Sequence, residues 1–385
     1  PYTPANAFWA GLIMTRRGQD YVVFSDADAT QSESLVGARL ISCDGIGAVD
    51  FAAARLGGFD AVWSIEAQRI QTAPALLLDR GNPFVARPTS CTFQAGDRRI
   101  EQTLAWREVA RADLRPLLWP ALNRGAAGFG VRAFQGGMWI GLETLRNEAA
   151  AVVAAVQDQE AALRAAPIVV LDLRGNGGGN SQFGADIAVA LFGEARFSHV
   201  FGGGDPDCGT VWRLSPRNLA TMRNYVSQFG ETNPAFADHM RETVAAAEGA
   251  TARGEEFSGR TDCEHGAPFP GEPPAQAAAG RIVLLTDNAC FSSCLIVTDI
   301  FRRLGALHVG QATDAATHYF EVREERLPSG LGYFSTLQAF SPASPAAMGP
   351  FEPTLRYDLD IGEVTDVGQK DVFESGHARC LLRFL

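Results

Sequence analysis

The sequence predicts an α/β protein with a β-rich N-terminal domain and a helical insertion in its second domain. Up to about residue 115, short segments alternate apolar and polar residues and end at turn signals, which is typical of strands. From about residue 128, apolar strand patterns alternate with helical patterns, as in proteins built from layers of strands and helices. We therefore expect one domain over 1–115 and a second over 116–385, interrupted by a helical insertion at 196–280.

In the N-terminal domain, the clearest strand signal is Ala38-Arg-Leu-Ile-Ser-Cys43. Its residues alternate between apolar and polar, and the turn signal Asp44-Gly45 follows at once. Residues 49–56 have helical spacing. Further strands are predicted at 21–24, 90–93 and 100–106.

In the second domain, the strongest strand signal is the apolar run Ile168-Val-Val-Leu-Asp-Leu173, which ends in a glycine-rich turn. A run of this kind is typical of a strand that is buried on both faces. Other core strands are predicted at 138–142, 281–285 and 307–310, and core helices at 147–165, 183–192 and 291–304. The insertion is expected to contain helices at 219–229 and 234–247.

Composition excludes several classes of function. Hydrophobic residues make up 46% of the 385 residues and charged residues 20%, as in an ordinary globular protein. The net charge of −11, without a basic run, argues against a nucleic-acid partner, because phosphates require clustered Lys and Arg. No uncharged apolar run reaches the roughly 18 residues of a membrane span. Cys263-Glu-His265 lacks further ligands at metal-site spacing, so we expect neither a metal nor a cofactor.

Seven cysteines suggest an oxidising compartment. Cys43 and Cys91 fall in one β-rich region, and Cys208 and Cys263 bracket the insertion, so each couple could form a local disulfide. Buried free thiols are the alternative. The chain begins at Pro1 without a signal peptide, so a leader has been removed or the N-terminus is missing from this sequence.

The first segment with chemical potential is Leu171-Asp-Leu-Arg-Gly-Asn-Gly-Gly-Gly179, a buried strand that ends in three consecutive glycines. Without a Cβ to obstruct them, such backbone amides can turn outward and bind a developing oxyanion. An ordinary tight turn is the alternative. A phosphate loop is not, because the Gly-Lys-Ser/Thr ending and the last glycine of G-x-G-x-x-G are both missing.

The second segment is Leu284-Leu-Thr-Asp-Asn-Ala-Cys-Phe-Ser-Ser-Cys294, in which a strand runs into a helix. A serine at that junction is exposed at the end of the sheet, and the helix N-terminus stabilises negative charge beside it. The alternative is that Ser292 or Ser293 simply caps the helix. Cys290 and Cys294 flank Ser292 four residues apart and can either form a disulfide or pack as thiols.

Together with Val309-Gly-Gln-Ala-Thr313, these two segments resemble the tail-specific (C-terminal-processing) protease family, whose core is of the crotonase and Clp-protease type. The phrase from Val36 to Gly45 resembles the PDZ-domain signature, so the N-terminal domain is expected to be PDZ-like. The resemblance implies a nucleophile at Ser292, with Ser293 as a rival. It also implies an oxyanion hole formed by the amides of Gly178 and Ser293.

The sequence departs from that family at the general base. In most members a lysine follows the serine, but Thr317 stands at that position, and the only lysine, Lys370, lies much further on. The tricorn-type branch uses Ser-His-Glu instead, and Glu352 matches its glutamate. The expected histidine would fall upstream of Pro1, and His318 is the alternative base within the chain. An exposed carboxylate and a structural histidine are the competing interpretations of Glu352 and His318.

The resemblance therefore implies a serine endopeptidase that hydrolyses protein or peptide substrates through an acyl-enzyme at Ser292, in the periplasm or outside the cell. The PDZ-like domain would hold a substrate tail by strand addition. Oligomeric state is open, and a homo-oligomer is compatible with the sequence. Because no base is identified, a non-catalytic protein that binds peptides or hydrophobic ligands on the same core is the alternative. A crotonase-type acyl-CoA enzyme is the third hypothesis, and both the PDZ-like phrase and Ser292 count against it.

Overall fold

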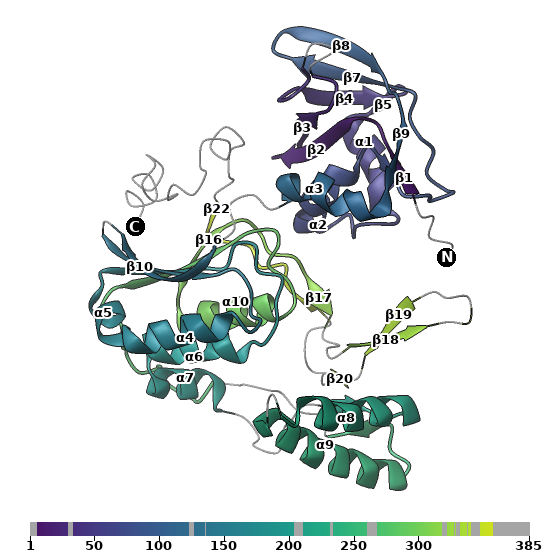
Figure 1. Cartoon of the computed structure of the whole chain (residues 1–385). Coiled ribbons are helices and arrows are strands. Elements are labelled where there is room, and N and C mark those ends of the chain that lie inside the picture. Colours follow the sequence, from purple (N-terminus) through teal and green to yellow (C-terminus); the bar gives the residue numbers. More distant parts are fainter. Residues whose placement is uncertain are drawn as a thin grey trace. The chain divides into compact units, whose positions relative to one another are not determined.

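The fold is that of a computed structural model, shown in Figure 1. Its described residues fall into two compact units. The larger unit lies within 3–193, 276–315 and 349–385, and the smaller within 1–2, 194–275 and 316–348. The described residues are 6–29, 34–122, 127–134, 136–203, 211–231, 234–259, 268–317, 322–326, 328, 332–336, 338–339 and 347–356.

The N-terminal part of the larger unit contains an antiparallel sheet in the order β2-β3-β4-β7-β8, with β5 paired to β4 (Figure 1). Its buried face carries Met14, Tyr21, Leu40 and Phe93, which pack into one apolar cluster. The strands predicted at 21–24, 38–43, 90–93 and 100–106 correspond to β3, β4, β7 and β8. The bounds are β2 Leu12–Arg17, β3 Asp20–Asp26, β4 Arg39–Cys43, β5 Ile46–Gly47, β7 Ser90–Ala95 and β8 Arg98–Thr103.

A disulfide links two neighbouring strands of this sheet. Cys43 and Cys91 lie opposite each other in the register of β4 and β7, and both are buried. The predicted pairing is therefore confirmed. At the end of β4, Asp44 has φ 45°, and its carboxylate accepts hydrogen bonds from Thr89 and Ser90. These bonds tie the predicted Asp-Gly turn to the start of β7.

Short helices and a second small sheet complete this part of the unit. The predicted helix at 49–56 becomes α1 followed by a π-helical turn, and β1 lies between β6 and β9. The bounds are β1 Asn6–Trp9, α1 Ala48–Ala52, the π-helical turn Ala53–Gly57, α2 Glu66–Thr72, the 3₁₀ turn Ala73–Ala75, β6 Leu78–Asp79, β9 Arg107–Ala110, the 3₁₀ turn Arg111–Asp113 and α3 Leu114–Leu122.

The core sheet has the order β10-β11-β12-β15-β16-β22, in which β10 is antiparallel and the other five strands are parallel. Helices α4, α6 and α10 lie together on one side of it (Figure 1). A separate apolar cluster contains Trp139, Val170, Val283 and Val309. The bounds are β10 Phe129–Phe134, β11 Gly137–Leu142, α4 Ala149–Asp158, α5 Glu160–Ala165, β12 Ile168–Asp172, α6 Gln182–Phe192, β15 Arg281–Thr286, α10 Ser293–Leu304, β16 Leu307–Gly310 and β22 Leu355–Arg356.

This topology places the functional segments. The carboxyl ends of parallel strands lie at the same edge of a sheet, and ligands bind in α/β proteins at that edge. Strands β12 and β15 are direct neighbours in register, and Asp172 lies opposite Leu285. The glycine-rich turn after β12 and the serine turn after β15 therefore leave the sheet side by side.

The smaller unit contains α8 and α9, which correspond to the helices predicted at 219–229 and 234–247. Ser215 caps α8 by accepting a hydrogen bond from the Asn218 amide, and Trp212, Met222 and Met240 form its apolar cluster. No helix in the described part of the chain is long and apolar enough to cross a membrane. The bounds are α7 Glu194–Phe201, β13 Val211–Arg213, α8 Pro216–Phe229, α9 Pro234–Ala252, β14 Phe257–Ser258, β17 Ala316–Thr317, β18 Val322–Arg326, β19 Gly332–Thr336, β20 Gln338–Ala339 and β21 Ala347–Met348.

Candidate active site

The glycine loop begins with a buried ion pair at the end of β12. Arg174 binds the Asp172 carboxylate through two guanidinium nitrogens, with Nη2 2.6 Å from Oδ2 and Nε 2.9 Å from Oδ1. The Arg174 amide also donates to Asp172 Oδ1 at 3.0 Å. Both side chains are almost completely buried, so this pairing fixes the direction in which the chain leaves the sheet.

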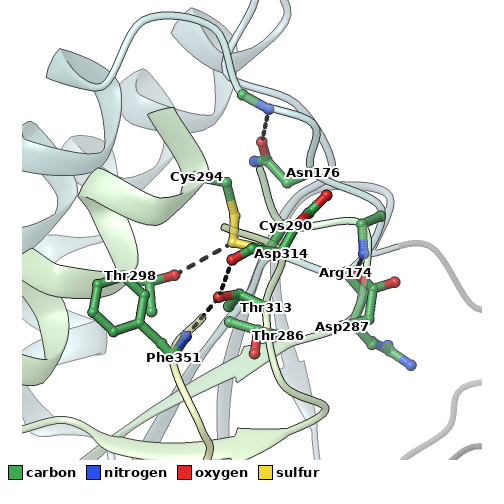
Figure 2. The surroundings of a disulfide bond; sticks show 12 residues. Arg174, Asn176, Thr286, Asp287, Cys290, Cys294, Thr298, Thr313, Asp314 and Phe351 are labelled. Atoms are coloured by element: carbon green, nitrogen blue, oxygen red, sulfur yellow. Dashed lines mark hydrogen bonds between the residues drawn. A yellow bond between two sulfur atoms is a disulfide. The ribbon is translucent and has the colours of Figure 1, made fainter. Parts of the chain in front are cut away.

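The middle of the loop is held by Asn176, which is fully buried. Its side-chain amide donates to the Leu142 carbonyl at 2.7 Å. Its Oδ1 accepts the Gly178 amide at 2.9 Å, the bond drawn as a dashed line at Asn176 in Figure 2. Beyond it, the Leu145 amide donates to the Gly178 carbonyl at 3.1 Å, and the Asn180 amide donates to the Leu145 carbonyl at 2.7 Å. The loop is thus fastened to the chain after β11 on one side.

Asp287 links the glycine loop to the chain that follows β15. Its carboxylate accepts the amides of Gly175 (3.0 Å) and Ala289 (3.0 Å). Burial raises the pKa of Asp287 to about 6, although the hydrogen bonds from Gly175 and Ala289 oppose that shift. Figure 2 shows Asp287 next to Arg174. One carboxylate therefore sets the spacing between the two functional segments.

The serine turn has an unusual backbone. Ser292 has φ 56° and ψ −126°, a conformation that favours glycine, and it immediately precedes α10. Non-glycine residues in such conformations cost about 1–3 kcal/mol and cluster at functional sites. The Phe291 amide donates to the Asn176 carbonyl at 3.3 Å, which brings this turn against the glycine loop.

The two segments meet at Gly178. A Cβ at this position would lie 2.9 Å from the Ser292 Cβ and 3.0 Å from the Ser293 nitrogen. Gly178 also has φ +101°, so both space and backbone conformation require glycine here. The structure therefore brings together three of the predicted site residues: Ser292, Ser293 and Gly178.

The two neighbouring serines differ in their hydrogen bonds. Ser293 Oγ donates to the Gly179 carbonyl at 2.5 Å and so joins α10 to the glycine loop. The Ser292 hydroxyl has no hydrogen-bond partner among the described residues, and it is half-buried. No described group accepts the Ser293 amide, whereas the Gly178 amide donates to Asn176. Of the two serines, Ser292 is therefore the one whose hydroxyl has no hydrogen-bond partner in the part of the chain that the structure describes.

A disulfide encloses the serine turn. Cys290 and Cys294 are bonded, with their Cα atoms 5.3 Å apart, and both are fully buried. Cys290 Sγ lies 3.4 Å from the Thr298 hydroxyl on α10 (Figure 2). Of the two possibilities that the sequence left open for this pair, the structure has the bridge.

Two cavities border the glycine loop, and Gly175 and Gly177 line both. The first, of about 590 Å³, is also lined by Phe291, Asp287 and Asp314. The second, of about 410 Å³, is also lined by Thr144, Glu143, Phe129, Gly178 and Gly179. Cavities of this size can accommodate a small ligand.

The predicted acid–base residues are not assembled around Ser292. The exposed Glu352 carboxylate lies 3.5 Å from Arg356, and among the described residues no histidine contacts it. His318 lies outside the described residues, as do Lys370, Cys208 and Cys263. Thr313 holds the segment before Glu352, because its hydroxyl accepts the Phe351 amide at 2.9 Å.

His308 is a buried histidine that the sequence did not single out. Its Nε2 lies 2.7 Å from the Thr286 hydroxyl, and burial lowers its pKa to about 4. Its ring is therefore neutral, and its contact with Thr286 joins β15 to β16. Sequence reasoning also missed the anchoring roles of Asn176 and Asp287. Asn176 and Asp287 both stand in the turn just after a buried apolar strand, β12 and β15 respectively. A polar side chain in that position is the sequence signal that could have identified them.

The profile of Peptidase family S41 matches residues 137–344, more than half of the chain. No curated protein matches. Among solved structures, mature CPAF is 13% identical with a TM-score of 0.58, and the match covers 94% of this chain and 79% of that one. Mature CPAF complexed with lactacystin is also 13% identical, with a TM-score of 0.56, 94% of this chain covered and 80% of that one. These two structures share the fold of this chain.

Proposed function

The chain belongs to peptidase family S41, and we propose that it is a serine endopeptidase that cleaves protein or peptide substrates through an acyl-enzyme at Ser292. The observation that carries this proposal is the serine turn. Ser292 has a positive φ at the N-terminus of α10, directly against the glycine loop, and its hydroxyl has no hydrogen-bond partner among the described residues. A nucleophile on a strained turn between a strand and a helix is exposed at the end of the sheet.

In the proposed reaction, Ser292 Oγ attacks the scissile carbonyl carbon, and a base accepts its proton. The Ser293 amide donates to the oxyanion, assisted by the positive end of the α10 dipole. The Gly178 amide is the second donor, and it must exchange Asn176 Oδ1 for the oxyanion as that charge develops. Collapse of the tetrahedral intermediate expels the amine, which takes up the proton, and water then hydrolyses the acyl-enzyme.

We assign the base to a histidine, because Thr317 stands where most relatives have a lysine. Two sources are proposed: a histidine upstream of Pro1 in a longer form of the chain, or His318. In either case Glu352 orients the ring, which requires its carboxylate to leave Arg356. The described histidine of the core, His308, is excluded because its ring is buried and bound to Thr286.

The test of the nucleophile compares the two adjacent serines. Ser292→Ala should abolish labelling by a fluorophosphonate probe, and Ser293→Ala should keep most of it, because the Ser293 hydroxyl donates to Gly179. Circular dichroism of both variants controls for folding. Equal labelling of Ser292→Ala and wild type would remove the assignment of the nucleophile.

The test of the base compares peptidase activity of three proteins: this chain, its His318→Ala variant, and a form extended upstream. If the upstream histidine is the base, extension should raise turnover by several orders of magnitude, since loss of a triad base leaves only oxyanion-hole catalysis. If His318 is the base, His318→Ala should inactivate the chain. Full activity of both unextended proteins would contradict both assignments.

We extend the proposal to location and substrate binding. The disulfides Cys43–Cys91 and Cys290–Cys294 support a periplasmic or secreted protein, because such bonds persist in oxidising compartments. The N-terminal sheet is proposed to act as a PDZ-like module that binds a substrate tail as an added strand. Loss of binding of C-terminal peptides after deletion of residues 1–115 would support that role.

The second candidate function is peptide binding without cleavage. Two observations favour it: no histidine contacts Ser292 among the described residues, and Asn176 occupies the Gly178 amide. If the protein only binds peptides, wild type and Ser292→Ala should bind them with equal affinity. Neither the chain nor its extended form should then be labelled by a fluorophosphonate. Turnover by either form would eliminate this candidate.

A further inference from the structure

The disulfide Cys290–Cys294 spans four residues of sequence, and Ser292 is its midpoint. We propose that this disulfide positions the nucleophile by holding the serine turn in its positive-φ conformation. The inference rests on the proposed function, because it assigns a role in presenting Ser292 to substrate. It concerns positioning residues, since neither sulfur touches the reacting atoms.

The upstream half of the turn is fixed to the core through Cys290. Its amide donates to the Asp287 carbonyl at 3.2 Å, and its carbonyl accepts the Asp314 amide at 3.1 Å. Its sulfur lies 3.4 Å from the Thr298 hydroxyl (Figure 2). Cys290 is thus held from three directions, and none of these contacts reaches Ser292 itself.

The downstream half of the turn is the beginning of α10. The Cys294 amide donates to the Phe291 carbonyl at 3.1 Å, and the Leu295 amide donates to the Ser292 carbonyl at 2.9 Å. These bonds hold Ser292 to the helix but not to Cys290. Within the described residues, the hydrogen bond from Cys294 to Phe291 and the disulfide both close the turn across Ser292, and the disulfide is the covalent link that reaches Cys290.

Such a link is needed because the conformation of Ser292 is unfavourable. A non-glycine residue with φ 56° and ψ −126° persists only where its surroundings over-determine it. Without the bridge, rotation of Ser292 to a negative φ would relieve this strain and turn its Oγ away from the Gly178 side of the loop. The bridge resists that rotation because it fixes both ends of the turn.

A purely structural role predicts a different outcome. A disulfide stabilises a fold mainly by restricting the unfolded chain, and this effect grows with the length of the loop that it closes. Cys290–Cys294 closes a very short loop, whereas Cys43–Cys91 spans 48 residues. The short bridge should therefore matter more for the local conformation of Ser292 than for the stability of the whole protein.

The experiment compares two double variants, Cys290→Ala/Cys294→Ala and Cys43→Ala/Cys91→Ala, with wild type in whichever form turns over a peptide substrate. For the first, kcat and the rate of fluorophosphonate labelling should fall by about 10²-fold, the effect of a small misplacement of a reacting group, with KM changing much less. For the second, Tm should fall further than for the first. A kcat within threefold of wild type in the folded Cys290→Ala/Cys294→Ala protein would overturn the proposal.

A second measurement covers a double variant that does not fold. Wild-type protein is treated with dithiothreitol until thiol mapping shows Cys290 and Cys294 free, and its kcat is measured before and after reoxidation. A reversible loss of kcat, with an unchanged circular dichroism spectrum, supports the positioning role, and unchanged kcat overturns it. A wild-type protein that is neither labelled nor active would instead remove the proposed function, and the inference would fall with it.

Discussion

The two disulfides among the described residues are both buried, but they restrict different states of the chain. Cys43–Cys91 joins two strands that are already paired, and it spans 48 residues. Cys290–Cys294 spans four residues and encloses a backbone conformation that serine disfavours. Chain-entropy arguments assign about 4 kcal/mol to the long loop and about 2 kcal/mol to the short one. The first bond thus restricts the unfolded chain, and the second restricts a turn in the native state.

Under the proposed function, stability and reactivity therefore depend on separate parts of the fold. In the N-terminal sheet, the disulfide Cys43–Cys91 joins two residues in regular strand conformation. The serine turn contains an unfavourable conformation that is held by its neighbours: the disulfide, Asp287 and the glycine loop. Strain of this kind is tolerated where it exposes a functional group.

The largest expected effect is on turnover, and it should distinguish the serine turn from the N-terminal sheet most clearly. Ser292→Ala should lower peptidase turnover by about 10⁴- to 10⁶-fold, as loss of a triad nucleophile does, and leave the free energy of unfolding almost unchanged. Steady-state kinetics and thermal unfolding of the same preparation measure both. If turnover survived, the serine turn would not be the reactive region.

The next effect concerns the disulfide Cys43–Cys91. Cys43→Ala/Cys91→Ala should reduce the free energy of unfolding by about 4 kcal/mol, because the unfolded chain regains the entropy of the long loop. Denaturant unfolding under oxidising conditions measures this loss. A smaller loss than for Cys290→Ala/Cys294→Ala would reverse the comparison.

The third prediction concerns pH and Asp287, which connects the two functional segments. Its folded-state pKa of about 6 is higher than the ordinary value, so the native state keeps a proton that the unfolded chain releases between about pH 4 and pH 6. The contribution of this proton to the free energy of unfolding is fully present below about pH 4, and it is lost as the pH rises through about 6. Relative to Asp287→Asn, wild type should lose up to about 3 kcal/mol of unfolding free energy between pH 4 and pH 7.

Denaturant unfolding of both proteins across that pH range tests the prediction. The amide of Asn has one accepting oxygen instead of two and carries no charge at any pH, so the variant carries a constant offset. The informative quantity is therefore the slope of the difference with pH. A flat difference would mean that the carboxylate is ionised in the folded protein throughout this range.

The smallest effect measures the strain itself. Ser292→Gly should be more stable than Ser292→Ala by about 1–2 kcal/mol, because glycine adopts a φ of 56° without a Cβ penalty. Both variants lack the hydroxyl, so the comparison isolates the backbone. Equal Tm values would show that the turn is not strained and that the disulfide has little to hold in place.

The sequence by itself determined much of the architecture. Apolar runs such as Ile168–Asp172 and Arg281–Thr286 predicted the parallel strands, because a strand buried on both faces needs continuous apolar residues. The location of Cys43 and Cys91 in one β-rich region also suggested their pairing, which the structure confirms. The hydroxyl residues Ser292 and Ser293 marked the second candidate segment, because they stand where a strand runs into a helix whose N-terminus stabilises negative charge.

The tertiary structure decided which of those residues meet and in what state. Two segments separated by more than 100 residues come together because β12 and β15 pair in the sheet, and no local pattern specifies that partner. Whether Cys290 and Cys294 form a bridge depends on the distance between their Cα atoms, which the backbone of the turn sets. Our preference for Ser292 over Ser293 likewise rests on a contact between distant residues, the hydrogen bond from Ser293 to Gly179, while the Ser292 hydroxyl has no partner among the described residues.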